Sequence, residues 1–221
     1  MRPARLSSIQ VWDGPVRLFH WGIVVLVFTS WLTQEESWMQ AHFISGYSIA
    51  AALLFRFVWG FIGSDTARFS RFLKNPLAAV IVLARFGRRE PDTEIGHNAA
   101  GGWMVVVMLV LLVVQVGTGL CATDDVMTEG PFSELVGSSW SDWLSHIHDL
   151  TFLAIEVAVG LHVLAVLAHA VIKRHDIVRP MITGRKRLPA TATPPRMASP
   201  WLAIALFALA GGIVAFAVTY W

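Results

Sequence analysis

The sequence predicts an all-α integral membrane protein, in which a four-helix transmembrane bundle is followed by a fifth, C-terminal transmembrane helix. Hydrophobic residues make up 55% of the 221 residues and charged residues only 14%, against about a quarter in soluble domains. The chain contains five long apolar runs, and its lysines and arginines fall in alternate loops between them. Together these observations exclude a soluble globular domain and indicate a chain that crosses the membrane several times.

Each of the five runs is long enough to cross a hydrocarbon layer about 30 Å thick. We expect the spans at residues 16–32, 42–62, 101–122, 147–172 and 201–221. Pro15 suits the first turn of the first span, and Asp13 is its expected cap. The apolar segment 76–86 is too short to span, so we predict a helix lying at the membrane interface.

The distribution of basic residues predicts the orientation of the chain. The N-terminus, the loop 64–97 and the segment 173–200 are basic, whereas the loops 33–41 and 123–147 contain no lysine or arginine. By the positive-inside rule, we expect the N-terminus in the cytoplasm and the C-terminus on the outer side of the membrane. The expected domain boundaries are a bundle at 1–187, a proline-rich and flexible linker at 188–200, and the additional helix.

The composition excludes several kinds of site and partner. The single cysteine, Cys121, rules out an internal disulfide and a four-cysteine iron–sulfur cluster, and no CxxCH motif for covalent haem occurs. The net charge of +2 and the pI near 9.0 come from loop residues that set topology, so no nucleic acid partner is expected. The N-terminus also lacks the pattern of a cleaved signal peptide.

The fourth span carries three histidines, His148, His162 and His169. His148 and His162 are fourteen residues apart, within about 40° of whole helical turns, so their imidazoles share one face about 21 Å apart along the axis. A polar imidazole within a membrane is costly and therefore usually functional. Two on one face suggest two haems stacked across the membrane.

Two further histidines lie at matching depths in the predicted topology. His42 is at the outer end of the second span, as His148 is of the fourth, and His20 is near the cytoplasmic end of the first. His20 therefore has either His162 or His169 as its partner, and spacing alone does not choose between them. Ligation of each iron by two histidines leaves no open coordination position, which suits electron transfer rather than oxygen chemistry.

Other polar residues are candidates for supporting roles. Arg56 follows His42 by fourteen residues and is a candidate partner of a haem propionate, with snorkelling to the interface as the alternative; Arg17 is a weaker candidate. Glu156 is expected to be a protonated packing residue or a proton relay, and Gln115 to hydrogen-bond between helices. His97 is expected in a loop, near a cytoplasmic quinone pocket if it has a function.

Several motifs together resemble the bacterial cytochrome b561 family, and most closely its branch of b-type subunits of nickel–iron hydrogenases. The motifs are VWDGPVRLFHW (11–21), HFISGY (42–47), LLFRFVWGFIGSDTARFS (53–70), GHNAAGG (96–102), TGLCATDD (118–125), HDL (148–150), GLH (160–162) and VRPMITGRK (178–186). The resemblance covers about residues 9–187. It implies a four-helix bundle with two haems b, ligated by His20 with His162 and by His42 with His148. It leaves His169 beside the inner haem or a quinone.

The resemblance and the histidines lead to one expected function and two alternatives. We expect a dihaem cytochrome b of a respiratory chain that transfers electrons across the inner membrane between quinone and a periplasmic redox partner, either a hydrogenase-type enzyme or a cytochrome c. The first alternative is an enzyme in its own right, a superoxide:quinone oxidoreductase, although the acidic outer loops disfavour it. The second is a haem-free metal-binding or transport protein. Besides membrane lipid, a second copy of the chain is a possible partner.

Overall fold

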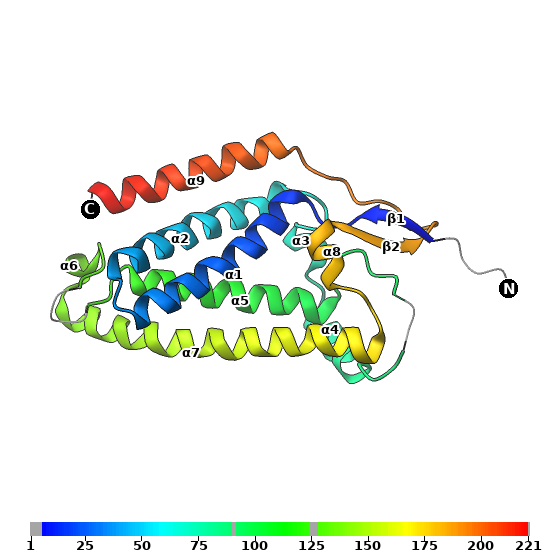
Figure 1. The fold of residues 1–221 in the computed structure, drawn as a ribbon, viewed down its shortest axis with the longest axis horizontal. Helices are drawn as coiled ribbons and strands as arrows, with labels where there is room; N and C mark the ends of the chain where they lie inside the picture. The colour runs from blue at the N-terminus through cyan, green and yellow to red at the C-terminus, as the bar shows by residue number, and fades with distance from the viewer. Residues whose placement is uncertain (1–5, 90–91, 124–127, 221) are drawn as a thin grey trace. The chain divides into compact units, whose positions relative to one another are not determined.

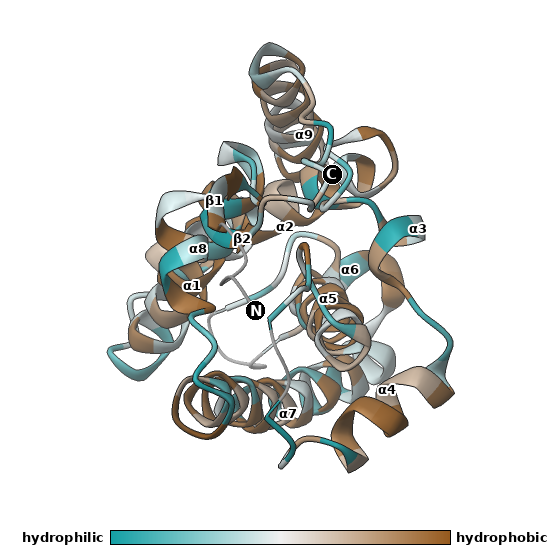
Figure 2. Cartoon of the chain, turned by 90° about the vertical axis from the view of Figure 1, so that its right-hand side faces the viewer, coloured by the Kyte–Doolittle hydropathy of each residue, from teal (hydrophilic) through white to brown (hydrophobic). Residues whose placement is uncertain are grey.

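The structure is a computed structural model that describes residues 6–89, 92–123 and 128–220. It confirms the predicted fold class, because the described residues include five helices long and apolar enough to cross a membrane (Figure 1). These helices are α1 (Gly14–Glu35), α2 (Met39–Ile62), α5 (Ala99–Gly119), α7 (Ser138–Ala168) and α9 (Pro200–Tyr220). Figure 2 shows these helices rich in apolar residues, as a hydrocarbon environment requires.

Helix α7 is longer than the sequence predicted. It begins at Ser138 rather than at residue 147, directly after Gly137, whose φ of +79° turns the chain before the helix. Its helical path continues through a π-helical turn, η1 (His169–Lys173). The first nine residues are polar or amphipathic, which is why hydropathy did not include them.

Among the described residues, four short helices lie between the long ones. They are α3 (Phe69–Phe72), α4 (Pro76–Ala84), α6 (Ser133–Val136) and α8 (Val178–Thr183). Helix α4 confirms the predicted helix in the segment 76–86. It starts with Pro76 in its first turn, and the Asn75 side chain caps it by accepting a hydrogen bond from the amide of Leu77 at 2.9 Å.

A small β-sheet was not predicted. Strands β1 (Leu6–Gln10) and β2 (Arg185–Pro189) pair antiparallel, with Leu6 opposite Pro189 and Gln10 opposite Arg185 (Figure 1). Residues 188 and 189, which we had assigned to the linker, therefore end a strand. Two five-residue strands with one buried apolar side chain each, Ile9 and Leu188, are too short for a clear alternating pattern.

The chain divides into two compact units. The unit that carries the β-sheet, called the sheet unit, comprises Phe57–Val106, Gly160–Ala203 and the chain up to Leu18. The other, called the helical unit, comprises Phe19–Arg56, Val107–Val159 and the chain from Ile204 onward.

The helical unit has an apolar core built from three helices. Ile49 and Leu53 of α2, Leu112 of α5 and Ile155 of α7 are buried together, and partly buried residues of α1 pack against them. Polar contacts add to this packing, since the hydroxyls of Ser30 and Ser45 lie 2.6 Å apart. This packing places residues of α2 and α7 next to one another, which the site below requires.

In the sheet unit, Asp13 organises the start of α1. One carboxylate oxygen accepts a hydrogen bond from the amide of Val16 at 2.7 Å, which confirms the predicted cap. The other accepts from the indole N–H of Trp59 at 3.0 Å, and Trp59 is fully buried. A single carboxylate thus ties the beginning of α1 to the end of α2.

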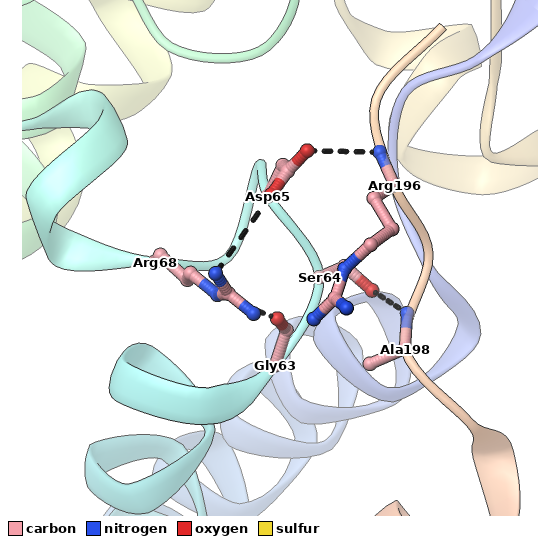
Figure 3. A network of polar contacts seen from close by, with 6 residues as sticks. All are labelled: Gly63, Ser64, Asp65, Arg68, Arg196 and Ala198. Carbon is pink, nitrogen blue, oxygen red and sulfur yellow. Dashed lines mark hydrogen bonds and ion pairs between the residues drawn. The ribbon is translucent and has the colours of Figure 1, made fainter.

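The segment before α9 is hydrogen-bonded to the turn after α2 within the sheet unit, in contrast to the flexible linker we expected. Asp65 and Arg196 exchange two hydrogen bonds, from the Arg196 amide to the Asp65 carboxylate at 2.9 Å and from the Asp65 amide to the Arg196 carbonyl at 3.0 Å (Figure 3). The buried Ser64 hydroxyl accepts from the Ala198 amide at 2.9 Å. The Gly-Ser-Asp turn that ends α2 therefore also holds a segment about 130 residues further along the chain.

Candidate functional site

His42 and His148, from α2 and α7, lie side by side in the helical unit. Their ring centroids are 6.4 Å apart, and the ring planes are inclined by 76°. Both rings are partly buried. The structure thus brings together one of the two histidine pairs that the sequence predicted.

Both rings are held through the same nitrogen. Nδ1 of His42 lies 2.9 Å from the carbonyl oxygen of Ser30 on α1, and Nδ1 of His148 lies 2.9 Å from that of Gln115 on α5. A carbonyl only accepts hydrogen bonds, so each Nδ1 carries the proton and donates. Each Nε2 then keeps its lone pair, which is the arrangement that metal-binding histidines use to fix tautomer and ring orientation.

The His148 ring packs against residues near the end of α5. A Cβ atom added at Gly119 would come within 2.7 Å of the ring carbon Cε1, so only glycine leaves room for the ring in this position. The Thr118 hydroxyl is 3.3 Å from Nδ1, and the Gln115 side-chain amide donates to Nε2 at 3.1 Å. These contacts confirm Gln115 as an interhelical hydrogen bonder.

Sequence reasoning missed the carbonyl of Ser30 and did not connect Gly119 with His148. Every residue has a backbone carbonyl, so the identity of Ser30 could not predict its contact with His42. Gly119 stands in a Gly-Thr-Gly run at the end of a span, which predicts close approach of helices or of a flat macrocycle but not which side chain it admits.

The two histidines of the other predicted pair belong to different units. His20 lies on α1 in the helical unit, partly buried, with its ring centroid 4.9 Å from that of Trp21. His162 lies on α7 in the sheet unit and is also partly buried. Their pairing stays a prediction.

His169 contacts other residues of the sheet unit. Its Nδ1 donates to the carbonyl of Ala165, one turn earlier in its own helical segment, at 2.8 Å. Its Nε2 faces the Asn98 amide at 3.5 Å, and the edge of its ring packs on Phe86 at 4.8 Å between centroids. His169 therefore lies among residues at the beginning of α5 and just after α4.

The two candidate arginines differ in their surroundings. Arg56 is only 3% exposed, and its guanidinium carbon lies 6.0 Å from the centre of the Phe19 ring, so it does not snorkel to the interface. Arg17 instead donates to the backbone carbonyls of Asp13 and Ile182 and ties α1 to α8. Of the two, Arg56 has the burial expected of a cation that pairs with a buried anion.

Two residues of open role have clear positions. Glu156 is exposed on α7, which argues against the packing role we expected. The His97 ring lies between Trp12 and Phe72, at centroid distances of 4.7 and 5.2 Å. His97 also lines a cavity of about 160 Å³ in the sheet unit, whose charged lining residues are Asp65, Arg71, Lys74 and Glu94.

Comparisons with known proteins identify the family. The family described as "Prokaryotic cytochrome b561" matches residues 11–184 of the chain. The chain belongs to the prokaryotic cytochrome b561 family. It is therefore a b-type cytochrome of a bacterial membrane, with haem b as its cofactor and electron transfer as its activity.

Similar curated proteins are named probable Ni/Fe-hydrogenase B-type cytochrome subunits. That of Bradyrhizobium diazoefficiens is 24% identical to this cytochrome over 81% of the chain and 86% of its own length. Those of Rhodobacter capsulatus and Rhizobium leguminosarum are each 25% identical, over 82% and 81% of this chain and 82% and 89% of their own lengths. No solved structure gives a significant match.

The histidine pair of this cytochrome fits a haem iron. If two imidazoles bound one metal ion from opposite sides through nitrogen, with bonds of about 2 Å and each ring centre about 1 Å beyond its nitrogen, their ring centres would lie about 6 Å apart. The centroids of His42 and His148 are 6.4 Å apart. With both Nδ1 atoms bound to carbonyls, the two Nε2 lone pairs are the ones that a haem iron would take, and at His148 the iron would replace the hydrogen bond from the Gln115 amide.

Proposed function

We propose that this cytochrome binds two haems b and transfers electrons across the inner membrane between quinone and a periplasmic redox partner. The N-terminus lies in the cytoplasm and the C-terminus in the periplasm in this proposal. His42 and His148 ligate the outer haem iron, and His20 and His162 the inner one. Haem supplies the one-electron redox chemistry, while the protein sets axial ligands, charge and access of water.

The observation that carries the proposal is the His42–His148 pair. Three helices contribute to it besides α2, which bears His42: α1 supplies the Ser30 carbonyl, α5 the Gln115 carbonyl and α7 the second ring. Two histidines held this way would supply two nitrogen ligands to one haem iron. Such saturated ligation favours electron transfer over chemistry at the metal.

For the inner haem, the support comes from spacing and from charge. His162 follows His148 by fourteen residues on one helix, the spacing that the family resemblance implies. The buried Arg56 lies in the helical unit against Phe19, the residue before His20. We propose that its guanidinium pairs with a propionate of the inner haem.

The partner proposal rests on the relatives. Their printed names associate them with nickel–iron hydrogenases. We propose that a hydrogenase-type enzyme at the periplasmic face delivers electrons to the outer haem and that quinone accepts them at the inner one. The acidic outer loop is where a basic partner would dock, and its residues Asp124 and Asp125 lie outside the described residues.

The test is the haem content and spectrum of the purified protein. The pyridine haemochrome of the wild type should give two haems per chain, with low-spin spectra. His42→Ala and His148→Ala should each retain one, and the double variant should retain the same one, because both remove a ligand from the same iron. Loss of both haems in the double variant would assign the two histidines to different irons. A wild type with no haem would instead favour a metal-binding or transport function.

A second measurement addresses the partner. In membrane vesicles, reduction of the haems by hydrogen should require the co-expressed hydrogenase, whereas superoxide should reduce the haems no faster than in the same vesicles with superoxide dismutase added. Rapid reduction by superoxide alone would favour the superoxide:quinone oxidoreductase.

A further inference from the structure

The segment from Thr66 to Arg89 is basic and holds an apolar helix. It contains six lysines and arginines and no acidic residue. Helix α4 lies within it and exposes a row of large apolar side chains: Leu77 (64%), Val80 (59%), Ile81 (43%) and Leu83 (62%). At nine residues, α4 is about 14 Å long and cannot span the membrane.

The end of α4 meets the end of the α7 helical segment, and both are basic. Phe86, just past α4, packs against the His169 ring, and the Lys173 ammonium lies 5.5 Å from the centre of the Phe86 ring. Arg89 donates through Nε to the carbonyl of Ile172 at 3.1 Å. These contacts bring two basic stretches together from positions more than 80 residues apart in the sequence.

We propose that this junction is a binding site for the headgroup of an anionic phospholipid, with α4 lying in the membrane interface beside it. The site, called the basic junction, consists of Arg85, Arg88, Arg89, Lys173 and Arg174. All five side chains belong to the sheet unit, and all but Lys173 are exposed.

A phospholipid matches both the cations of the basic junction and the apolar face of α4. Its phosphate is an anion with oxygens that arginine can bind in a forked geometry. Its acyl chains need an apolar surface next to that phosphate, which the exposed face of α4 provides. An acidic peptide or free phosphate would use the cations but not the apolar row.

A simpler role for these cations is to compensate the carbonyls at the end of the α7 segment. Arg89 does so with its Nε. Arg85 and Arg88 are exposed and do not take part in the hydrogen bond to Ile172. They are therefore the residues that separate lipid binding from helix capping.

Native mass spectrometry of the purified haem-loaded protein tests the proposal. The protein is titrated with phosphatidylglycerol or phosphatidylcholine of the same chain length, and the first binding constant is compared. We expect the wild type to prefer phosphatidylglycerol at least tenfold. Since each cation near an anionic surface contributes roughly a fivefold effect, Arg85→Gln with Arg88→Gln should remove most of that preference.

A matched control removes two charges elsewhere in the sheet unit. Arg179 and Arg187 are also exposed, and Arg179→Gln with Arg187→Gln should keep the preference. Glycerol 1-phosphate, which carries the headgroup phosphate without acyl chains, should not compete at concentrations equal to the lipid.

Three results would overturn the proposal. The first is equal affinity of the wild type for both lipids. The second is an equal loss in both double variants, which would mean that only net charge matters. The third is full competition by glycerol 1-phosphate, which would make the junction a phosphate site. A haem spectrum and a melting curve recorded for each variant show that a lost preference does not come from unfolding.

Discussion

His148 and His169 lie near opposite ends of one continuous helical segment, Ser138–Lys173, and both donate from Nδ1 to a backbone carbonyl. The His148 acceptor is Gln115 on another helix, and a second imidazole lies 6.4 Å away. The His169 acceptor is Ala165, four residues earlier in the same segment.

The difference shows which kind of histidine hydrogen bond helps to identify a ligand site. A hydrogen bond to the preceding turn is available to a histidine on any helix and needs no partner element. A bond to a neighbouring helix fixes the ring only where the bundle has placed that helix. The first kind therefore does not identify a ligand, whereas the second, with a facing imidazole, supports one.

The largest expected effect comes from replacing the histidines in the second half of this helical segment. His162→Ala should remove one of the two haems, because it deletes an axial ligand, while His169→Ala should retain both. The haem-to-protein ratio from the pyridine haemochrome measures this. Loss of a haem in His169→Ala but not in His162→Ala would show that depth in the membrane, rather than the fourteen-residue spacing, selects the inner ligand.

A second prediction concerns the contact between Gly119 and the His148 ring. Gly119→Ala places a methyl group 2.7 Å from Cε1, so the ring must move, at a cost of about 1–3 kcal/mol. We expect reduced occupancy of the outer haem, or a changed low-spin EPR signal in the fraction that retains it. Gly117→Ala is the matched control, since a Cβ there would have nothing within 4 Å. Equal effects of the two changes would contradict a specific contact with the ring.

A third and smaller effect concerns the buried cation Arg56. If its guanidinium pairs with a haem propionate, Arg56→Gln should lower the reduction potential of the inner haem by tens of millivolts, because a nearby positive charge stabilises the reduced state. A redox titration followed at the haem bands resolves this shift. Arg187→Gln, which removes an exposed charge from β2, should leave both potentials unchanged. An unshifted potential in Arg56→Gln would remove this arginine from the site.

The smallest expected effect lies in the docked segment before α9. Asp65→Ala removes the acceptor of the Arg196 amide, a loss of about 1 kcal/mol, so trypsin should cleave after Arg196 faster. Limited proteolysis followed by mass spectrometry measures the rate, and the haem content should not change. Asp142→Ala, at an exposed residue of α7, serves as control. An unchanged rate after Arg196 would show that other contacts hold the segment.

Much of the fold was predictable because hydrophobic length is a local property. Five apolar runs and the cap at Asp13 were read correctly from neighbouring residues. The extension of α7 to Ser138 was not, since polar residues interrupt its few apolar ones and leave no continuous hydrophobic run. The β-sheet was missed because each strand has only five residues.

The sequence by itself determined the number of spans, the candidate ligands and the spacing between them, since helix rise and hydrophobic thickness are constants. Only the tertiary structure decided which groups meet. Gln115 lies 33 residues before His148, Asp65 lies 131 residues before Arg196, and Phe86 precedes Lys173 by more than 80. Such contacts depend on how helices pack and where loops return, and the backbone carbonyls that orient both site histidines have no counterpart in the identity of any side chain.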